Sequence, residues 1–190
     1  SFDLLLLHNP DRTGYSSPVV WEQGMAALRD AGLTRLLGVA PGPANGFTLD
    51  MLECFERFGE LIDWAMVILN PFEPWPSELV LPAARQAGID IIARVADFGG
   101  IFHDDVRPGH RFLEYDHRTF RPAGWVEQAN ERLEQVRPIA ERHGLTMLQL
   151  AAFWNLAPSA TSGGTSPIRP IVNVPPSAPA SATSPLAAPR

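Results

Sequence analysis

The chain has 190 residues, of which 45% are apolar and 19% are charged, and its formal net charge is −6. These proportions predict a single globular domain with a substantial core. An acidic chain lacks the basic face that nucleic acids and anionic membranes need, so neither partner is expected. All 15 basic side chains are arginine, which excludes catalysis by a lysine within these residues.

The sequence predicts a cytoplasmic protein. Cys54 is the only cysteine, so the chain forms no internal disulfide and a reducing compartment is expected. The apolar run over residues 4–7 is too short to span a membrane and lacks the flanks of a secretory signal. Because Ser1 is not an initiator methionine and a strand is predicted to begin almost at once, we expect the chain to be a fragment of a larger protein.

Four short apolar runs are predicted to be strands. They recur at intervals of roughly 25–30 residues, the length of one strand and one helix. The runs cover residues 3–8, 33–39, 64–69 and 89–95. The first ends in His8, so a buried strand is expected to deliver one polar group to its carboxyl end.

Helical patterns with recognisable ends lie between these runs. Ser17 is the predicted N-cap of the first helix, which ends before Gly32; its inward-facing residues are expected to be Val20, Met25 and Leu28. Thr48 is predicted to cap the second helix, whose expected apolar face is Leu49, Leu52, Phe55 and Phe58. The third helix is expected to end near Gly88.

The alternation of apolar strands with helices predicts an α/β fold in which helices cover a parallel sheet. An open doubly wound sheet and a (β/α)₈ barrel both satisfy this pattern. No glycine-rich G-x-G-x-x-G turn follows a strand, and polar residues follow the strand ends, which favours the barrel. We therefore expect a partial (β/α)₈ TIM barrel of about four parallel βα units, with extra helices over residues 125–143 and 147–156.

Two segments depart from this regular pattern. Residues 97–124 are far longer than a usual βα connection, and long loops are often functional. After Ala157 the residues are mostly Pro, Ser, Ala, Thr and Gly, which predicts a disordered tail over residues 158–190. The folded domain is thus expected to cover residues 1–157, and residues 171–174 are a weak candidate for a further strand.

Several segments of the chain stand in a specific order. Residues 3–10 read DLLLLHNP, residues 35–39 read RLLGV, residues 69–72 read LNPF, and residues 139–151 read IAERHGLTMLQLA, followed by WNL. In this order the segments resemble the aldo/keto reductase family over about residues 2–157, from its fourth barrel strand to the helix before its last strand. The resemblance ends at Ala157, and an altered reading frame would explain the aberrant tail.

The resemblance implies an NADP(H)-linked barrel enzyme that reduces small-molecule aldehydes and ketones. The family uses a tyrosine proton donor assisted by lysine, aspartate and histidine, and only the histidine has a counterpart here, at His8. The other three belong to strands that precede Ser1 in the family, so we expect the chain to be inactive alone. A neutral imidazole at a strand end can polarise a carbonyl oxygen. The alternative for His8 is a structural cap that bonds a backbone carbonyl.

Three further positions are implied to bind the NADPH cofactor, namely Ala40, Asn70 and Arg94. Ala40 and Pro41 stand where the family usually has Ser-Asn to hold the nicotinamide amide, and neither side chain forms hydrogen bonds. Asn70 directly follows the third strand. Arg94 replaces an aromatic residue that stacks on the nicotinamide; a guanidinium can also stack, but a salt bridge to Asp97 or to the long loop explains it equally well.

Two other functions stay open. A metal-dependent hydrolase would use ligand-type residues of the long loop: His103, Asp104, Asp105, His110, Asp116 and His117. Metal sites on barrels take ligands from several strand ends, and Arg107, Arg111 and Arg118 can neutralise these carboxylates, so no metal is expected. The missing amide-clamp residues favour the other alternative, a non-catalytic accessory barrel that binds a partner.

Overall fold

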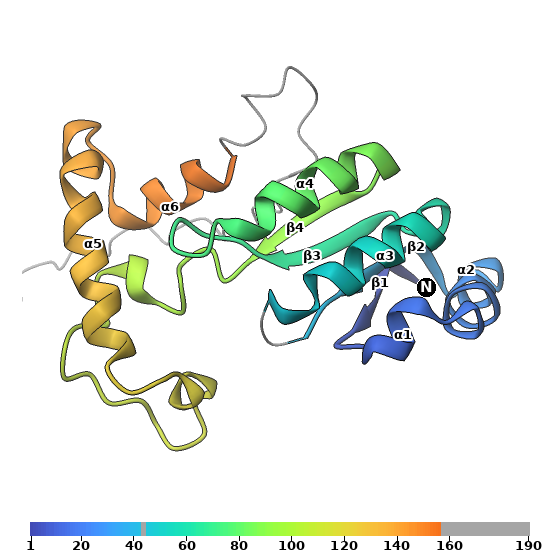
Figure 1. Ribbon diagram of the computed structural model, residues 1–190, viewed down its shortest axis with the longest axis horizontal. Helices are drawn as coiled ribbons and strands as arrows, with labels where there is room; N and C mark the ends of the chain where they lie inside the picture. The colour runs from blue at the N-terminus through green and yellow to red at the C-terminus, as the bar shows by residue number, and fades with distance from the viewer. Residues whose placement is uncertain (43–44, 157–190) are drawn as a thin grey trace, which may run out of the picture.

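Four parallel strands form the centre of the protein (Figure 1). The computed structural model describes residues 1–42 and 45–156. The strands are β1 (Phe2–His8), β2 (Thr34–Ala40), β3 (Trp64–Ile68) and β4 (Asp90–Arg94), hydrogen-bonded in the order β1-β2-β3-β4. Each strand begins and ends within one residue of its predicted bounds. The prediction of an α/β fold with a parallel sheet is confirmed.

Helices follow each strand. After β1 come α1 (Arg12–Ser16), a π-helix (Val19–Met25) and α2 (Ala26–Asp30); β2 is followed by α3 (Thr48–Phe58), β3 by α4 (Trp75–Ala87), and β4 by α5 (Trp125–Arg142) and α6 (Met147–Leu156). Between β4 and α5 the chain forms only two short 3₁₀ turns, η4 (Ile101–His103) and η5 (His117–Phe120). Figure 1 shows α3 and α4 beside the sheet, whereas α5 lies apart from it.

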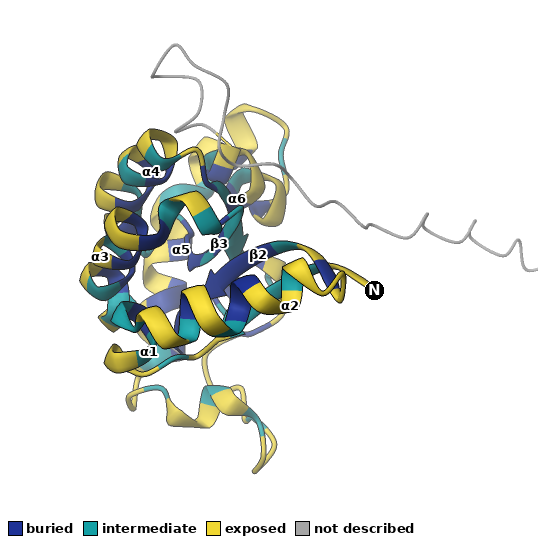
Figure 2. Ribbon diagram, turned by 90° about the vertical axis from the view of Figure 1, so that its right-hand side faces the viewer, coloured by how far each residue is buried: buried dark blue, intermediate teal, exposed yellow. Residues whose placement is uncertain are grey.

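The main core lies between one face of the sheet and the helices that follow the first three strands (Figure 2). Side chains alternate between the two faces of a strand. Leu37 and Val39 of β2 point to the helices and are fully buried, as is Ile91 of β4. The alternate residues Met66 and Ile92 face the other side, where they are only partly buried. The sheet therefore has one face covered by helices and one more open face.

Helix boundaries confirm part of the local predictions. The Ser17 hydroxyl accepts a hydrogen bond from the Val20 N–H at 3.4 Å, as an N-cap does. Gly88 ends α4 in the left-handed conformation, which glycine adopts without strain. Pro138 is accommodated inside α5, which continues to Arg142.

Three predictions about side-chain orientation are wrong. Leu28 is 38% exposed, because the wider turn of the π-helix rotates the residues that follow it. Leu49 is 70% exposed, because the buried face of α3 is formed by Met51, Cys54, Phe55 and Phe58. Thr48 does not cap α3: its hydroxyl donates to the Asn45 carbonyl at 2.8 Å, and Phe47 occupies the N-cap position.

A second apolar cluster holds the segment after β4 together. Phe98, Ile101 and Phe102 of the long connection pack against α5 and α6, where Leu133 is fully buried. No helix in the described ranges has the length and apolar character needed to cross a membrane. The predicted disordered tail and the weak strand candidate at residues 171–174 lie outside the described residues.

Gly38 is required for the pairing of β2 with β3. A Cβ at this position would meet the Trp64 carbonyl and the Leu6 side chain more closely than real Cβ atoms come. Gly38 is paired with Trp64 in the sheet, so neither backbone can move away cheaply. We expect Gly38→Ala to lower the free energy of unfolding by about 1–3 kcal/mol in chemical denaturation.

Gly46→Ala is the matched control, since a Cβ there meets nothing within 4 Å. Equal stability of the two variants would contradict the tight packing at Gly38.

Candidate functional site

The structure brings the predicted site residues to one edge of the sheet. The carboxyl ends of parallel strands share one edge, and in the sheet His8 pairs with Ala40 while Arg94 pairs with Ile68. Their predecessors Leu7, Val39 and Ala93 pack into the helix-side core. His8, Ala40 and Arg94 therefore lie on the opposite, more open face. In barrel folds, this end of the strands is where active sites form.

His8 is exposed and its ring makes no hydrogen bond to the described residues. The chain turns away directly after it: Asn9 adopts a left-handed conformation and its N–H donates to the Ala40 carbonyl at 2.8 Å. The turn leaves the imidazole at the rim of the sheet. The alternative role of His8, a structural cap, would require its ring to donate a hydrogen bond to a backbone carbonyl. Within the described residues the ring forms no such hydrogen bond.

Asn70 is fully buried, and every hydrogen-bonding position of its amide is used. Its nitrogen donates to Glu73 Oε2 at 2.9 Å and to the Val95 carbonyl at 3.1 Å. Its oxygen accepts from the N–H groups of Phe72 and Glu73, both at 3.0 Å. Asn70 thus fastens the connection after β3 to the end of β4. A direct contact between Asn70 and a cofactor stays a prediction.

Arg94 reaches across the carboxyl edge to the loop after β2. Its Nη2 donates to the carbonyl oxygens of Gly42 at 2.7 Å and Pro41 at 3.3 Å, and its Nε is buried without a partner. Burial lowers the pKa of the Arg94 guanidinium. The suggested salt bridge to Asp97 is not formed, because Asp97 pairs with His103 at 3.3 Å instead.

Tyr15 of α1 lies behind the same loop. It is 1% exposed and stacks on Phe47, with 5.7 Å between ring centroids. Its hydroxyl lies beside Gly42 without forming a hydrogen bond of good geometry, and burial raises the pKa of Tyr15 to about 12. Asp11 is the N-cap of the helix that contains Tyr15, and its side chain accepts a hydrogen bond from the Gly14 N–H at 2.8 Å. This N-cap residue could have located the helix from the sequence.

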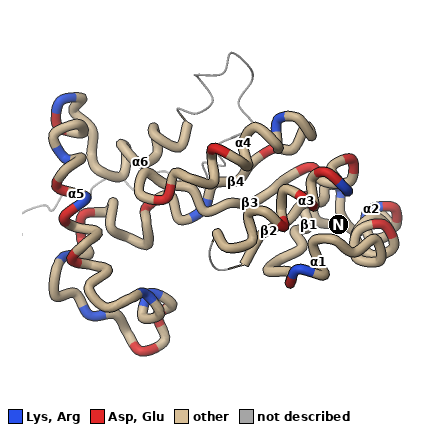
Figure 3. The backbone as a smooth tube through the Cα atoms, in the orientation of Figure 1, with Lys and Arg blue, Asp and Glu red and all other residues tan. Residues whose placement is uncertain are grey.

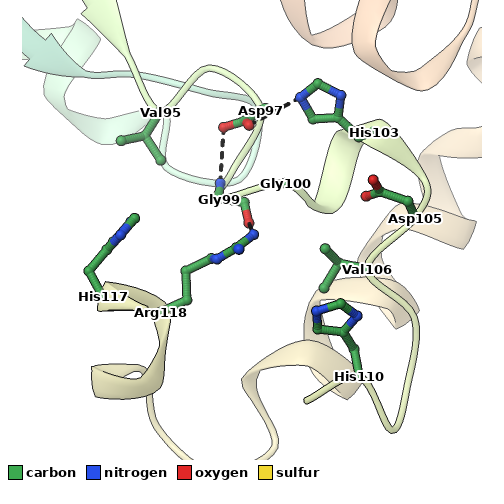
Figure 4. Close-up of a pocket in the computed structure, with 10 residues that line it drawn as sticks. All are labelled: Val95, Asp97, Gly99, Gly100, His103, Asp105, Val106, His110, His117 and Arg118. Atoms are coloured by element: carbon green, nitrogen blue, oxygen red, sulfur yellow. Dashed lines mark hydrogen bonds and ion pairs between the residues drawn. The ribbon is translucent and has the colours of Figure 1, made fainter. Parts of the chain in front are cut away.

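A cavity of about 590 Å³ opens beyond the end of β4 (Figure 4). Asp97 accepts a hydrogen bond from the Gly99 N–H at 3.1 Å and pairs with His103 on one side of the cavity. On another side, Arg118 Nη1 donates to the Gly99 carbonyl at 3.2 Å. The rest of the Arg118 guanidinium grips both oxygens of Asp116, and these hydrogen bonds hold the pKa of Asp116 well below its usual range.

A nicotinamide dinucleotide does not fit the described residues completely. Ala40 has no side-chain donor or acceptor, and the amide of Asn70 is already used. The cavity beyond β4 is lined by two carboxylates, Asp97 and Asp105, and its one arginine is paired with Asp116. This balance gives little surplus positive charge for phosphate groups.

Arginines neutralise two carboxylates of the long loop, Asp104 and Asp116, as predicted for Arg107 and Arg118, whereas Arg111 forms no ion pair with the described residues. Asp104 contacts Arg107 at 2.6 Å and accepts two hydrogen bonds from Arg137, at 2.7 and 2.9 Å. Figure 3 shows the alternating charges along α5, where Arg137 lies. Among the residues with described positions, no group of three or more His, Cys, Asp or Glu side chains is arranged to hold a metal ion.

The parallel sheet, its helices and the polar strand ends define the class of protein as an α/β barrel scaffold with a site at the carboxyl edge. The sequence profile of the Aldo/keto reductase family matches residues 1–175. The chain therefore belongs to the aldo/keto reductase family. The matched region extends 18 residues beyond Ala157, the residue at which the resemblance was expected to end.

Solved structures similar to this chain include two from bacteria. A glycerol dehydrogenase from Gluconobacter oxydans has a TM-score of 0.65 and 22% identity over 87% of this chain. An aldo/keto reductase from Klebsiella pneumoniae, in complex with NADP and acetate, has a TM-score of 0.53 and 18% identity over 80% of this chain. The chain spans 47% and 44% of their lengths, so it has the fold of a partial barrel. No curated protein matches it.

Loss of the Asn70 amide will loosen the carboxyl edge. Asn70→Ala removes four hydrogen bonds and leaves the Phe72 N–H without its hydrogen-bond acceptor, so we expect the free energy of unfolding to fall by about 3 kcal/mol. Chemical denaturation measures this loss, with Gln86→Ala, on the exposed surface of α4, as the control. A loss below that of the control variant would show that Asn70 does not hold this edge.

The Asp104–Arg137 pair makes stability depend on pH. Hydrogen bonds from Arg137 lower the pKa of Asp104 in the folded protein. Its stabilisation is therefore full above the unfolded pKa of about 3.9 and is lost as the pH falls through the folded value. We expect Asp104→Asn to cost about 1 kcal/mol at pH 6 and less below pH 3.5, by thermal unfolding at each pH. A cost that stays constant with pH would contradict the ion pair.

Proposed function

We propose that this chain forms part of an NAD(P)H-dependent oxidoreductase that reduces aldehyde or ketone groups of small molecules to alcohols. Family membership supports the reaction class. The observation that carries the proposal is the placement of His8, an exposed imidazole at the carboxyl edge of a parallel sheet, without a hydrogen-bond partner among the described residues. The acidic composition and the buried lone cysteine favour a cytoplasmic location.

His8 is the group that polarises the substrate. A neutral imidazole donates its N–H to the carbonyl oxygen and stabilises the negative charge that grows there during reduction. The ring is free to do so because it spends no hydrogen bond on the described part of the chain.

The cofactor is NADP(H), which is bound in the solved structure of the Klebsiella pneumoniae aldo/keto reductase. We assign to Arg94 and Asn70 the support of the cofactor pocket, since both tie together the loops that follow the strands. The small side chain of Ala40 leaves space in the cofactor pocket but forms no hydrogen bond. The nicotinamide amide would take its hydrogen bonds from groups other than these three.

The chain alone does not turn over in this account. It has no lysine, and neither tyrosine is placed as a proton donor. Tyr15 is buried, with its pKa raised to about 12, so it does not reach a substrate. Tyr115 is 95% exposed, away from the carboxyl edge in the long connection. A donor must therefore come from other polypeptide.

A second candidate function is an accessory barrel that binds a partner without catalysis. The absence of side-chain donors at Ala40 and the full use of Asn70 favour it. The two functions differ in one respect: only the reductase needs His8.

Complementation separates the two functions. The 190-residue chain is co-expressed with the amino-terminal half of the Gluconobacter oxydans glycerol dehydrogenase, and NADPH oxidation by an aldehyde is followed at 340 nm. We expect no turnover by the chain alone and measurable turnover by the pair. His8→Ala should then reduce the rate about 100- to 1,000-fold.

His143→Ala, an exposed histidine at the end of α5, is the matched control and should leave the rate unchanged. Turnover that is indifferent to His8→Ala, or a folded complex that binds NADPH without reducing the aldehyde, would favour the accessory barrel.

A further inference from the structure

Arg94 carries a positive charge at the carboxyl edge that nothing in the described chain neutralises. Its two hydrogen bonds go to the backbone carbonyls of Pro41 and Gly42, which orient the guanidinium but carry no net charge. Within residues 1–42 and 45–156, no carboxylate forms an ion pair with it. Arg118 and Arg121 of the long loop differ in this respect, since Arg118 is paired with Asp116 and Arg121 with Glu73.

The partly buried environment of Arg94 raises the free-energy cost of leaving its charge unpaired. The side chain is half-buried, and its Nε is fully buried without a hydrogen-bond acceptor. The adjacent Tyr15 hydroxyl is a second buried polar group without a partner, and Tyr15 interacts electrostatically with Arg94. An uncompensated charge in such a place normally has a counter-ion. The missing counter-ion points to a ligand.

We propose that Arg94 binds the carboxylate or phosphate group of an anionic carbonyl substrate. Nη2 is turned toward the loop after β2, so Nη1, which makes no hydrogen bond to the described residues, is the donor left for the ligand. A charge-assisted hydrogen bond of this kind is among the stronger polar contacts in proteins. That the anion is carried by a carbonyl compound rests on the proposed function.

The sheet geometry limits the length of such a substrate. His8 ends β1 and Arg94 ends β4, but the guanidinium reaches back to Gly42, next to the end of β2. Neighbouring strands lie about 4.8 Å apart, so the charge is about 5–10 Å from the position of His8. A carbonyl at His8 and an acid group at Arg94 would then be separated by a few carbon atoms. The substrate class is a short oxo acid or a phosphorylated aldehyde.

Binding to the 190-residue chain tests the anion site without cofactor or turnover. Succinate and inorganic phosphate are the anionic probes, glycerol is the neutral probe, and isothermal titration calorimetry is the readout. We expect saturable binding of at least one anion and none of glycerol. Arg94→Met should weaken anion binding about ten- to hundredfold, and Arg94→Lys should restore part of it.

Arg132→Met is the matched control, because Arg132 is exposed on α5 without an ion pair, and it should bind like the unchanged protein. Thermal unfolding of each variant confirms that it is folded. Unchanged binding in a folded Arg94→Met variant, equal loss in Arg132→Met, or no anion binding by the unchanged protein would overturn the proposal.

The cofactor also carries phosphates, so NADPH affinity is measured on the same variants by fluorescence. Loss of NADPH binding in Arg94→Met with succinate binding unchanged would assign Arg94 to the cofactor and overturn the substrate proposal. A different outcome separates the two proposals: succinate binding depends on Arg94, but the rate of aldehyde reduction does not change in His8→Ala. That outcome would support the anion site and contradict the proposed function.

Discussion

Parallel in-register pairing of four strands is the constraint on which the site depends. Because β1 to β4 run in one direction, their carboxyl ends meet at one edge, and strict alternation places His8, Ala40 and Arg94 on one face. The pairing thus brings His8 and Arg94, which are 86 positions apart in sequence, to the same edge. The tight contact of Gly38 with Trp64 fixes the middle of this register.

The edge itself is held by polar side chains that work in different ways. Asn70 uses its whole amide to join the loop after β3 to the end of β4. Arg94 uses only part of its guanidinium on the loop after β2, and no carboxylate of the described residues neutralises its charge. His8 makes no hydrogen bond through its ring to the residues that the structure describes. The edge thus combines one purely structural group with two that have binding capacity left, which is what a site needs.

The sequence predicts the elements of this fold better than their contacts. Periodicity locates all four strands, and glycine chemistry locates the end of α4 at Gly88. The exposed Leu28 could not be foreseen, because the π-helix before it changes the helical phase. The hydrogen bond from Arg94 to Gly42 joins residues 52 positions apart, and no local pattern encodes it. The site residues were therefore foreseeable as positions at strand ends, but their partners were not.

The most direct test of this account is the strand register, measured by nuclear Overhauser effects between backbone protons in the folded chain. The account predicts cross-strand contacts that pair His8 with Ala40 and Ile68 with Arg94. Contacts showing His8 opposite Val39, or antiparallel pairing of β1 with β2, would break the shared edge and contradict the site.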